Sequence, residues 1–195
     1  MAQEIVQKLN WIDIVLIIVI LRALFVSLKR GFVNELLQLL AVLAAICVVL
    51  HYYPFCSRFL ENRVFVKAEI ARSVTFLSLW VLVALVCKFV RSGIHLLLKI
   101  DAKSAIDKIG GLGVGLVRGV LVSSLLLSFF ATTGLEYLSR HIQGSYLSPH
   151  VAPLAPGFYR VVFNEVVVKY FPDEKMNQDL LGSRKEPGPQ ARKDK

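Results

Sequence analysis

Charged residues are scarce in this sequence. Asp, Glu, Lys and Arg make up 19% of its 195 residues, whereas about 25% is usual in soluble domains. The apolar share is 55%, above the roughly 45 to 50% of soluble chains, and the apolar residues gather in long runs. This composition argues against a disordered chain and against an ordinary cytosolic globule. We therefore expect an integral membrane protein.

Cysteine and the common catalytic motifs are also rare or missing. The three cysteines, Cys47, Cys56 and Cys87, are an odd number without C-x-x-C spacing, so they imply neither a disulfide framework nor a structural zinc site. The four histidines are scattered. The sequence contains no G-x-S-x-G, H-E-x-x-H or Walker motif. We therefore expect no enzymatic activity, no metal and no cofactor.

The net charge is nevertheless +9, from 23 basic and 14 acidic residues. In a soluble chain, such an excess would suggest a nucleic-acid partner. Here the basic residues flank apolar runs, and the chain has no basic module interleaved with aromatic residues. Basic residues in these positions are attracted to anionic lipid headgroups. The expected partner is thus a bilayer with anionic headgroups and not nucleic acid.

Four apolar runs are long enough to span a bilayer, at about 11–28, 32–50, 73–90 and 112–133. The first has 18 residues and, at about 1.5 Å per residue, nearly crosses a hydrocarbon core of about 30 Å. About three residues separate the first two runs, so we expect an antiparallel helical hairpin. The sequence predicts an all-α integral membrane protein with about four transmembrane helices.

Composition also divides the chain into segments. We expect an N-terminal segment at 1–10, the membrane domain at 11–134, a juxtamembrane amphipathic segment at 135–172 and a disordered charged tail at 173–195. The amphipathic segment should contain helical pieces after the last span, and the strongest apolar cluster in it is 158–171.

Loops are expected between the spans. Pro54 follows two tyrosines at the exit of the second run and is predicted to stop that helix. Residues 55–72 are polar enough for a loop. Residues 91–111 surround a short apolar patch with basic residues, which predicts an interfacial helix or loop.

Five ionisable residues fall within or near the predicted spans: Asp13, Arg22, Glu35, Lys88 and Arg118. A charge at membrane depth is costly, so each needs a partner, water or a place near the interface. Interface placement is the simpler interpretation for the two acids and the lysine, which lie close to span ends. The two arginines lie deeper. We expect Arg22 to reach Glu35 or Gln38 across the hairpin, and Arg118 to find Glu35, Asp13 or backbone carbonyls.

Small residues recur every four positions at the start of the fourth run: Asp107, Gly111, Gly115, Gly119 and Ser123. They therefore share one side of a helix, and Gly-x-x-x-Gly allows helix backbones to approach closely in lipid. A shorter series on the first run consists of Ala23, Ser27 and Gly31. We expect the two series to face each other, either within one chain or between copies of a homo-oligomer.

Several short motifs accompany these runs. Trp11-Ile12-Asp13 opens the first span, a string from 27 to 35 with Arg30-Gly31 and Glu35 forms the hairpin, and His51-Tyr52-Tyr53 ends the second run. Later, Asp107, Gly111, Gly115 and Arg118-Gly119 fit the pattern D-x-x-x-G-x-x-x-G-x-x-R-G-x-L, and residues 145–149 fit S-x-L-x-P. Over about residues 10–160, these motifs resemble the colicin V production protein (CvpA) family.

The resemblance implies a multi-pass protein of the bacterial inner (cytoplasmic) membrane. It implies a part in the production or export of a peptide toxin and in envelope maintenance, with no established catalytic activity. We expect a non-enzymatic accessory or scaffold protein that acts as a homo-oligomer or with a membrane-protein partner. The alternative is a small oligomeric transporter or channel. The residues expected to carry the structural or functional role are Asp13, Arg22, Arg30, Gly31, Glu35, Asp107, Gly111, Gly115, Arg118 and Gly119.

Overall fold

The computed structural model describes residues 10–63, 68–97, 105–132, 138, 141–142 and 144–170. Every regular element in these ranges is a helix. The four long ones are α2 (Trp11–Arg30), α3 (Phe32–Arg63), α4 (Ala68–Leu97) and α5 (Ala105–Thr132). Each is long and apolar enough to cross a membrane. The predicted all-α membrane protein with four transmembrane helices is therefore confirmed.

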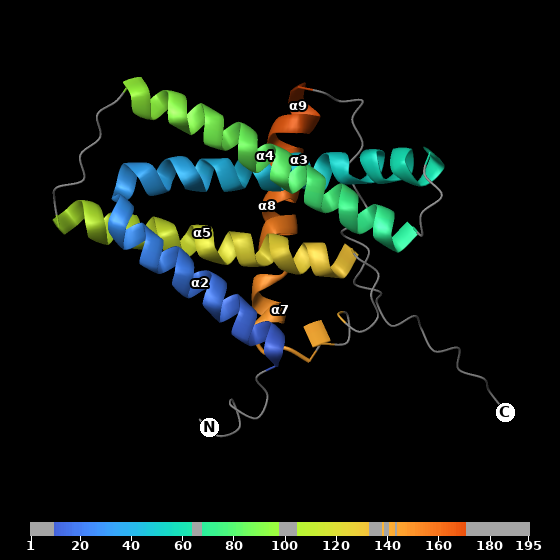
Figure 1. The fold of residues 1–195 in the computed structure, drawn as a ribbon, viewed down its shortest axis with the longest axis horizontal. Coiled ribbons are helices and arrows are strands. Elements are labelled where there is room, and N and C mark those ends of the chain that lie inside the picture. The colour runs from blue at the N-terminus through green and yellow to red at the C-terminus, as the bar shows by residue number, and fades with distance from the viewer. Residues whose placement is uncertain are drawn as a thin grey trace.

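The four helices form a bundle in which chain neighbours are not always the closest partners. α3 and α5 lie at its centre, with α2 along α5 and α4 along α3 (Figure 1). α2 and α3 turn back on each other at Gly31, as the short connection predicts, but α2 then diverges and makes most of its contacts with α5. The main packing seam of the first span is thus with the last span.

Two helix boundaries predicted from the sequence are wrong. α3 does not stop at Pro54 but continues to Arg63, and α4 already begins at Ala68, so most of the predicted loop at 55–72 is helical. An internal proline removes one backbone hydrogen bond. The buried Ser57 side chain donates to the Pro54 carbonyl at 3.2 Å in the turn that follows the proline.

The end of α4 and the start of α5 also extend beyond the apolar runs. α4 continues to Leu97 and α5 begins at Ala105, so much of the segment 91–111 belongs to the ends of long helices instead of a separate interfacial element. Apolar content sets where a chain enters lipid, but a helix can continue into water because its backbone hydrogen bonds are internal. Residues 98–104 lie outside the described part of the chain.

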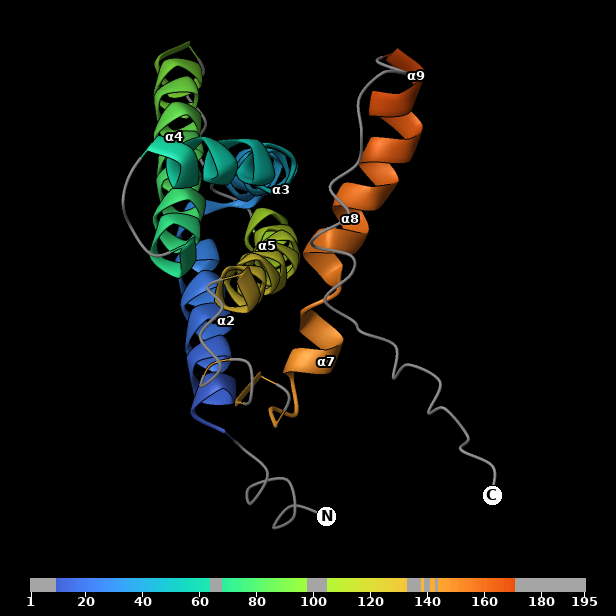
Figure 2. The ribbon, with the colours of Figure 1, turned by 90° about the vertical axis from the view of Figure 1, so that its right-hand side faces the viewer.

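After α5, the chain forms an arm of short helices that crosses the bundle. The arm comprises α7 (Ser148–Val151), α8 (Leu154–Val162), the π-helical turn η1 (Phe163–Val167) and α9 (Val168–Tyr170). It runs steeply across α3 and α5 and stands on one side of the bundle (Figures 1 and 2). The helical segments expected after the last span are thus present, and the main one begins at Leu154, before the predicted 158. The tail at 173–195 lies outside the described residues.

The apolar core lies where the arm meets the bundle. One cluster joins Ile46 and Leu50 of α3, Phe76 of α4 and Leu125 of α5 with the arm residue Tyr159. A second cluster joins Ile12 and Leu16 of α2 with Leu127 of α5 and Val151 of α7. Many apolar residues on the outer faces of the helices are exposed, as expected for faces that contact lipid.

Candidate functional site

The turn between α2 and α3 is fastened to the first turns of α5. Gly31 has a φ of 75°, a conformation that favours glycine because glycine has no Cβ. A Cβ on Gly111 would lie 3.0 Å from the Gly31 carbonyl carbon, so the backbones meet directly. Asp107 Oδ1 accepts a 2.8 Å hydrogen bond from the Phe32 N–H, and its negative charge is favourable at the start of α3. The hairpin turn is therefore held by α5.

Further along α5, glycines lie against small residues of α2. A Cβ on Gly115 would overlap the Ser27 side chain, 2.5 Å from its Oγ, and a Cβ on Gly119 would lie 2.9 Å from Ala23 Cβ. Ser27 is fully buried, and its hydroxyl donates to the Leu24 carbonyl at 2.8 Å. Larger residues at either glycine would force the helices apart.

The structure thus brings the two series of small residues together within one chain. In lipid, this kind of packing depends on close backbone approach, because hydrocarbon tails are as apolar as the side chains they would replace. The sequence left open whether the series pack within one chain or between copies. Since α2 occupies this face of α5, the α5 series does not serve as a homo-oligomer interface in this fold.

Arg118 of α5 lies at the centre of a buried polar cluster. Its Nε is 3.0 Å from Glu35 Oε2, and its guanidinium also donates to Gln38 Oε1 and, at 3.4 Å, to the Ala23 carbonyl. Glu35 is fully buried and the Arg118 side chain is 14% exposed. Arg118 therefore ties α5 to both α3 and α2 by an internal acceptor, as its depth in the span requires.

The contacts of Arg118 bear on the predicted partners and placements of the other ionisable residues. Glu35 and Gln38 contact Arg118, so the expectation that Arg22 reaches them is wrong. Arg22 instead has an exposed side chain. Glu35 is also not at an exposed interface, because the α2–α5 seam covers it. Lys88 is exposed near the end of the apolar part of α4, which agrees with interface placement.

Asp13 is buried as well, but it has a different set of partners. Its Oδ2 accepts from the Asn10 N–H at 2.9 Å, which closes a capping box at the start of α2. Its Oδ1 accepts from the Ser145 hydroxyl at 2.6 Å and from the Leu147 N–H at 2.9 Å, and Oδ2 accepts from the Tyr146 N–H at 3.3 Å. Asp13 therefore binds the segment after the last span and is not a partner of Arg118.

A second polar contact strengthens the same junction. The Asn10 side-chain amide donates to the His141 carbonyl at 3.0 Å and lies 3.0 Å from His141 Nδ1. The Trp11 ring meets the imidazole edge to face, with ring centres 6.0 Å apart. The start of α2 is thus held to the chain that leaves α5 by both side chains and backbone.

Comparison with known proteins shows which family the chain resembles. The family model described as Colicin V production protein matches residues 12–156. The chain belongs to the colicin V production protein family. The matched region contains Asp13, Glu35, Arg118 and Ser145, as well as the small-residue series, so the resemblance inferred from the motifs is confirmed.

Three curated relatives are similar over most of their length. A colicin V production protein homolog of Haemophilus influenzae is 31% identical over 150 residues, which cover 76% of this chain and 90% of the relative. The colicin V production protein of Escherichia coli is 36% identical over 119 residues, 61% of this chain and 72% of the relative. A colicin V production protein homolog of Buchnera aphidicola is 27% identical over 164 residues, which cover 83% of this chain and 94% of the relative. No solved structure matches the chain significantly.

The arm of this family member is joined to the bundle by Ser124, which the sequence analysis did not single out, and by His51, which it named only as part of a motif. Ser124 of α5 accepts a 2.8 Å hydrogen bond from the Ala155 N–H and donates to the Ala152 carbonyl at 3.1 Å, so it fixes the joint between α7 and α8. His51 of α3 and the Tyr159 hydroxyl lie 3.0 Å apart. The only sequence signal for the first contact is a serine pair inside an apolar run.

The buried polar clusters connect separate helices. Within the described residues, no group of three or more His, Cys, Asp and Glu side chains is arranged to hold a metal ion. The buried charges instead connect helices that are distant in the sequence, with Asp13 joining α2 to the arm and Glu35 joining α3 to α5. This multi-pass membrane protein thus uses its buried carboxylates to define one helix arrangement.

Proposed function

We propose that this chain is a non-enzymatic accessory protein of the bacterial inner membrane. It serves the production or export of a peptide toxin such as colicin V and contributes to maintenance of the cell envelope. The names of its relatives, colicin V production protein and homologs, support the toxin role. The protein lies in a bilayer with anionic headgroups. It acts with a second copy of itself or with another membrane protein.

The use of Asp13 is the observation that best supports this proposal. A carboxylate that works as an acid or base needs access to a substrate. Asp13 is fully buried, and its two oxygens accept four hydrogen bonds from the chain itself. It holds the arm in one position against the bundle, which is the task of a scaffold.

The arm offers the surface for a partner. Its inner side packs on the bundle through Tyr159 and Phe163, while Val161 and Val168 are exposed. Because Asp13 and Ser124 fix where the arm begins, the position of this apolar surface is set by the membrane helices. We propose that a membrane-protein partner docks against the outer side of the arm.

Toxin release by a complemented strain tests the proposal. In a colicin V-producing host that lacks its own family member, the chain should restore the zone of growth inhibition and resistance to detergent. Asp13→Asn should reduce both, because it releases the arm. Glu165→Gln, which removes an exposed charge on the arm, is the matched control and should act like the parent. Parent protein that reaches the membrane but restores neither property would refute the accessory role.

Flux through vesicles tests the alternative of a small oligomeric transporter or channel. Purified protein in liposomes should be silent to ions and small solutes if the accessory role is correct. A flux that requires the protein and disappears in Arg118→Ala at unchanged folded yield would support a transporter instead. Crosslinking from a photoreactive residue at position 161, compared with position 18 on the lipid-facing side of α2, then identifies the partner of the arm.

A further inference from the structure

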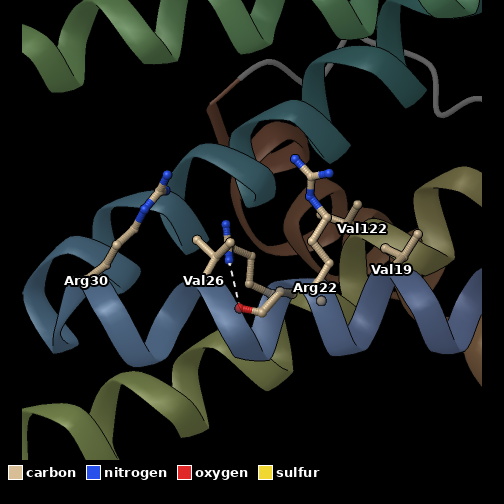
Figure 3. Close-up of a pocket in the computed structure, with 8 residues that line it drawn as sticks. Val19, Arg22, Val26, Arg30 and Val122 are labelled. Carbon is tan, nitrogen blue, oxygen red and sulfur yellow. Dashed lines mark hydrogen bonds between the residues drawn. The ribbon is translucent and has the colours of Figure 1, made fainter.

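A basic pocket of about 250 Å³ lies between α2 and α5. Its charged lining consists of Arg22 and Arg30 from α2 and Arg118 from α5, and its apolar lining includes Val19 and Val26. Figure 3 shows the Arg22 and Arg30 side chains extending from the same side of α2. The lining residues of α2 recur every three or four positions, so they share one face of that helix.

Positive charge is not balanced in this pocket. Glu35 pairs with Arg118, whereas no acidic partner is found for Arg22 or Arg30 within the described part of the chain. None of the described residues that line the pocket is acidic. Arg30 ends α2 and Arg22 lies eight residues before it, about 12 Å further along the helix. Arg22 lies inside the first span, where an unpaired cation is costly, and an anion between Arg22 and Arg30 would reduce that cost.

We propose that the pocket binds a phosphate-bearing anion, supplied either by the headgroup of an anionic phospholipid or by free phosphate. Guanidinium groups match phosphate oxygens because they offer several N–H donors in a planar fork. The volume also fits, since pockets for whole small molecules are typically about 300–1,000 Å³ and this one is smaller. A phospholipid headgroup or a single phosphate group can enter a pocket of this size.

The surroundings favour the lipid source. Basic pockets between transmembrane helices are typical sites for anionic headgroups. On the side of α2 away from α5, Ile18, Leu21 and Phe25 are exposed apolar residues, so acyl chains can lie along the helix while the headgroup enters beside Arg30. This inference rests on the proposed placement in an anionic bilayer, but not on the accessory role in toxin production.

Lipid binding by the purified full-length protein tests the site. Native mass spectrometry in a neutral detergent would measure bound phosphatidylglycerol and cardiolipin, with phosphatidylcholine as the uncharged reference. The variants are Arg22→Gln, Arg30→Gln and their double. Lys29→Gln is the matched control, because Lys29 is exposed next to Arg30 but lies over the Phe25 ring, outside the pocket lining. Arg118 is left intact because it holds the bundle together.

Each arginine variant should bind the anionic lipids about tenfold more weakly, since each loses a charge-assisted contact. Lys29→Gln should bind within about twofold of the parent because it leaves these contacts intact. If inorganic phosphate at millimolar levels displaces the lipid and binds with the same dependence on Arg22 and Arg30, the source is free phosphate; if it does not, the source is the lipid.

Two results would overturn the site. One is anionic lipid binding that falls equally in Lys29→Gln and in the arginine variants, which would indicate a general charge effect. The other is the absence of binding of anionic lipid and phosphate by the folded parent. Because the assay reads lipid and phosphate binding alone, loss of the site and failure of the toxin-release test remain separate outcomes.

Discussion

The Ser145 hydroxyl donates a 2.6 Å hydrogen bond to Asp13 Oδ1, although 132 positions separate the two residues in the chain. Both are buried. Asp13 lies in the first turn of the first span, and Ser145 lies in the segment that follows the last span. One carboxylate thus connects the beginning and the end of the four-helix unit and sets where the arm starts.

Asp13→Asn should release this junction. The amide replaces one acceptor oxygen by an N–H₂ group that faces two donors: the Ser145 hydroxyl and the Leu147 N–H if it takes the place of Oδ1, or the Asn10 and Tyr146 N–H groups if it takes the place of Oδ2. Leaving buried donors unsatisfied costs about 1–3 kcal/mol each, so thermal unfolding in detergent should begin at a lower temperature, and proteolysis should cut the segment near Ser145 faster. Glu165→Gln should change neither. An unchanged cleavage rate in Asp13→Asn would show that the arm does not depend on this carboxylate.

Gly115→Ala should destabilise the bundle, because its Cβ would overlap the Ser27 side chain. Overpacking of this kind typically costs about 1–3 kcal/mol. Folded yield after size-exclusion chromatography in detergent measures the effect, and the double variant Gly115→Ala, Ser27→Gly should recover part of it by vacating the space.

Gly113→Ala is the matched control for that series. Gly113 lies in the same helix, but a Cβ there would meet nothing within 4 Å. It should be neutral or slightly stabilising, since alanine favours a helix over glycine by roughly 0.5–1 kcal/mol. Equal losses from Gly113→Ala and Gly115→Ala would contradict the α2–α5 contact as the cause, because a Cβ at Gly113 meets nothing.

Arg118→Lys should be partly defective. A lysine ammonium is a point charge that cannot contact Glu35, Gln38 and the Ala23 carbonyl together as the guanidinium does. Arg118→Ala should be worse, because removing one partner of a buried pair leaves the other charge uncompensated, at a cost of about 3–5 kcal/mol.

Double-variant cycles identify the partner of Arg118. Glu35→Ala combined with Arg118→Ala should cost clearly less than the sum of the single changes, whereas Asp13→Ala combined with Arg118→Ala should be additive. Folded yield and unfolding temperature are measured for every variant of both cycles. Additivity with Glu35, or parental behaviour of Arg118→Lys, would contradict the buried pair.

The ends of the bundle should be accessible from opposite sides of the membrane. Asp107 binds the turn at Gly31, so Lys29 and Lys108 belong to one end, while the Asp13 contacts place Gly144 at the other. In a variant whose three native cysteines are replaced by alanine, Lys29→Cys and Lys108→Cys should react with an impermeant maleimide from the same side. Gly144→Cys should react from the other side. Labelling of positions 29 and 108 from different sides would contradict the four-span arrangement, because the chain between them would then cross the membrane an odd number of times.

The spans were predictable because apolar length is a local property of the chain. A run of about 20 apolar residues can satisfy its backbone only as a helix in lipid, whatever the rest of the protein does. The spacing of Gly111, Gly115 and Gly119 likewise indicates close packing without naming a partner. Boundaries were less predictable: α3 continues through Pro54 to Arg63, although a proline locally disfavours the interior of a helix.

Composition and residue spacing were therefore enough to predict the all-helical class, the four spans, the small-residue face of α5 and the need for partners of the charges at membrane depth. Which partners these charges have depends on how the helices pack. Glu35 pairs with Arg118 and not with Arg22, although Arg22 is much closer in the chain, because α2 crosses onto α5 at the glycines and leaves the Arg22 side chain exposed while Glu35 is buried. Asp13 binds the arm because backbone N–H groups from after the last span converge on it, and that convergence depends on how the whole bundle closes.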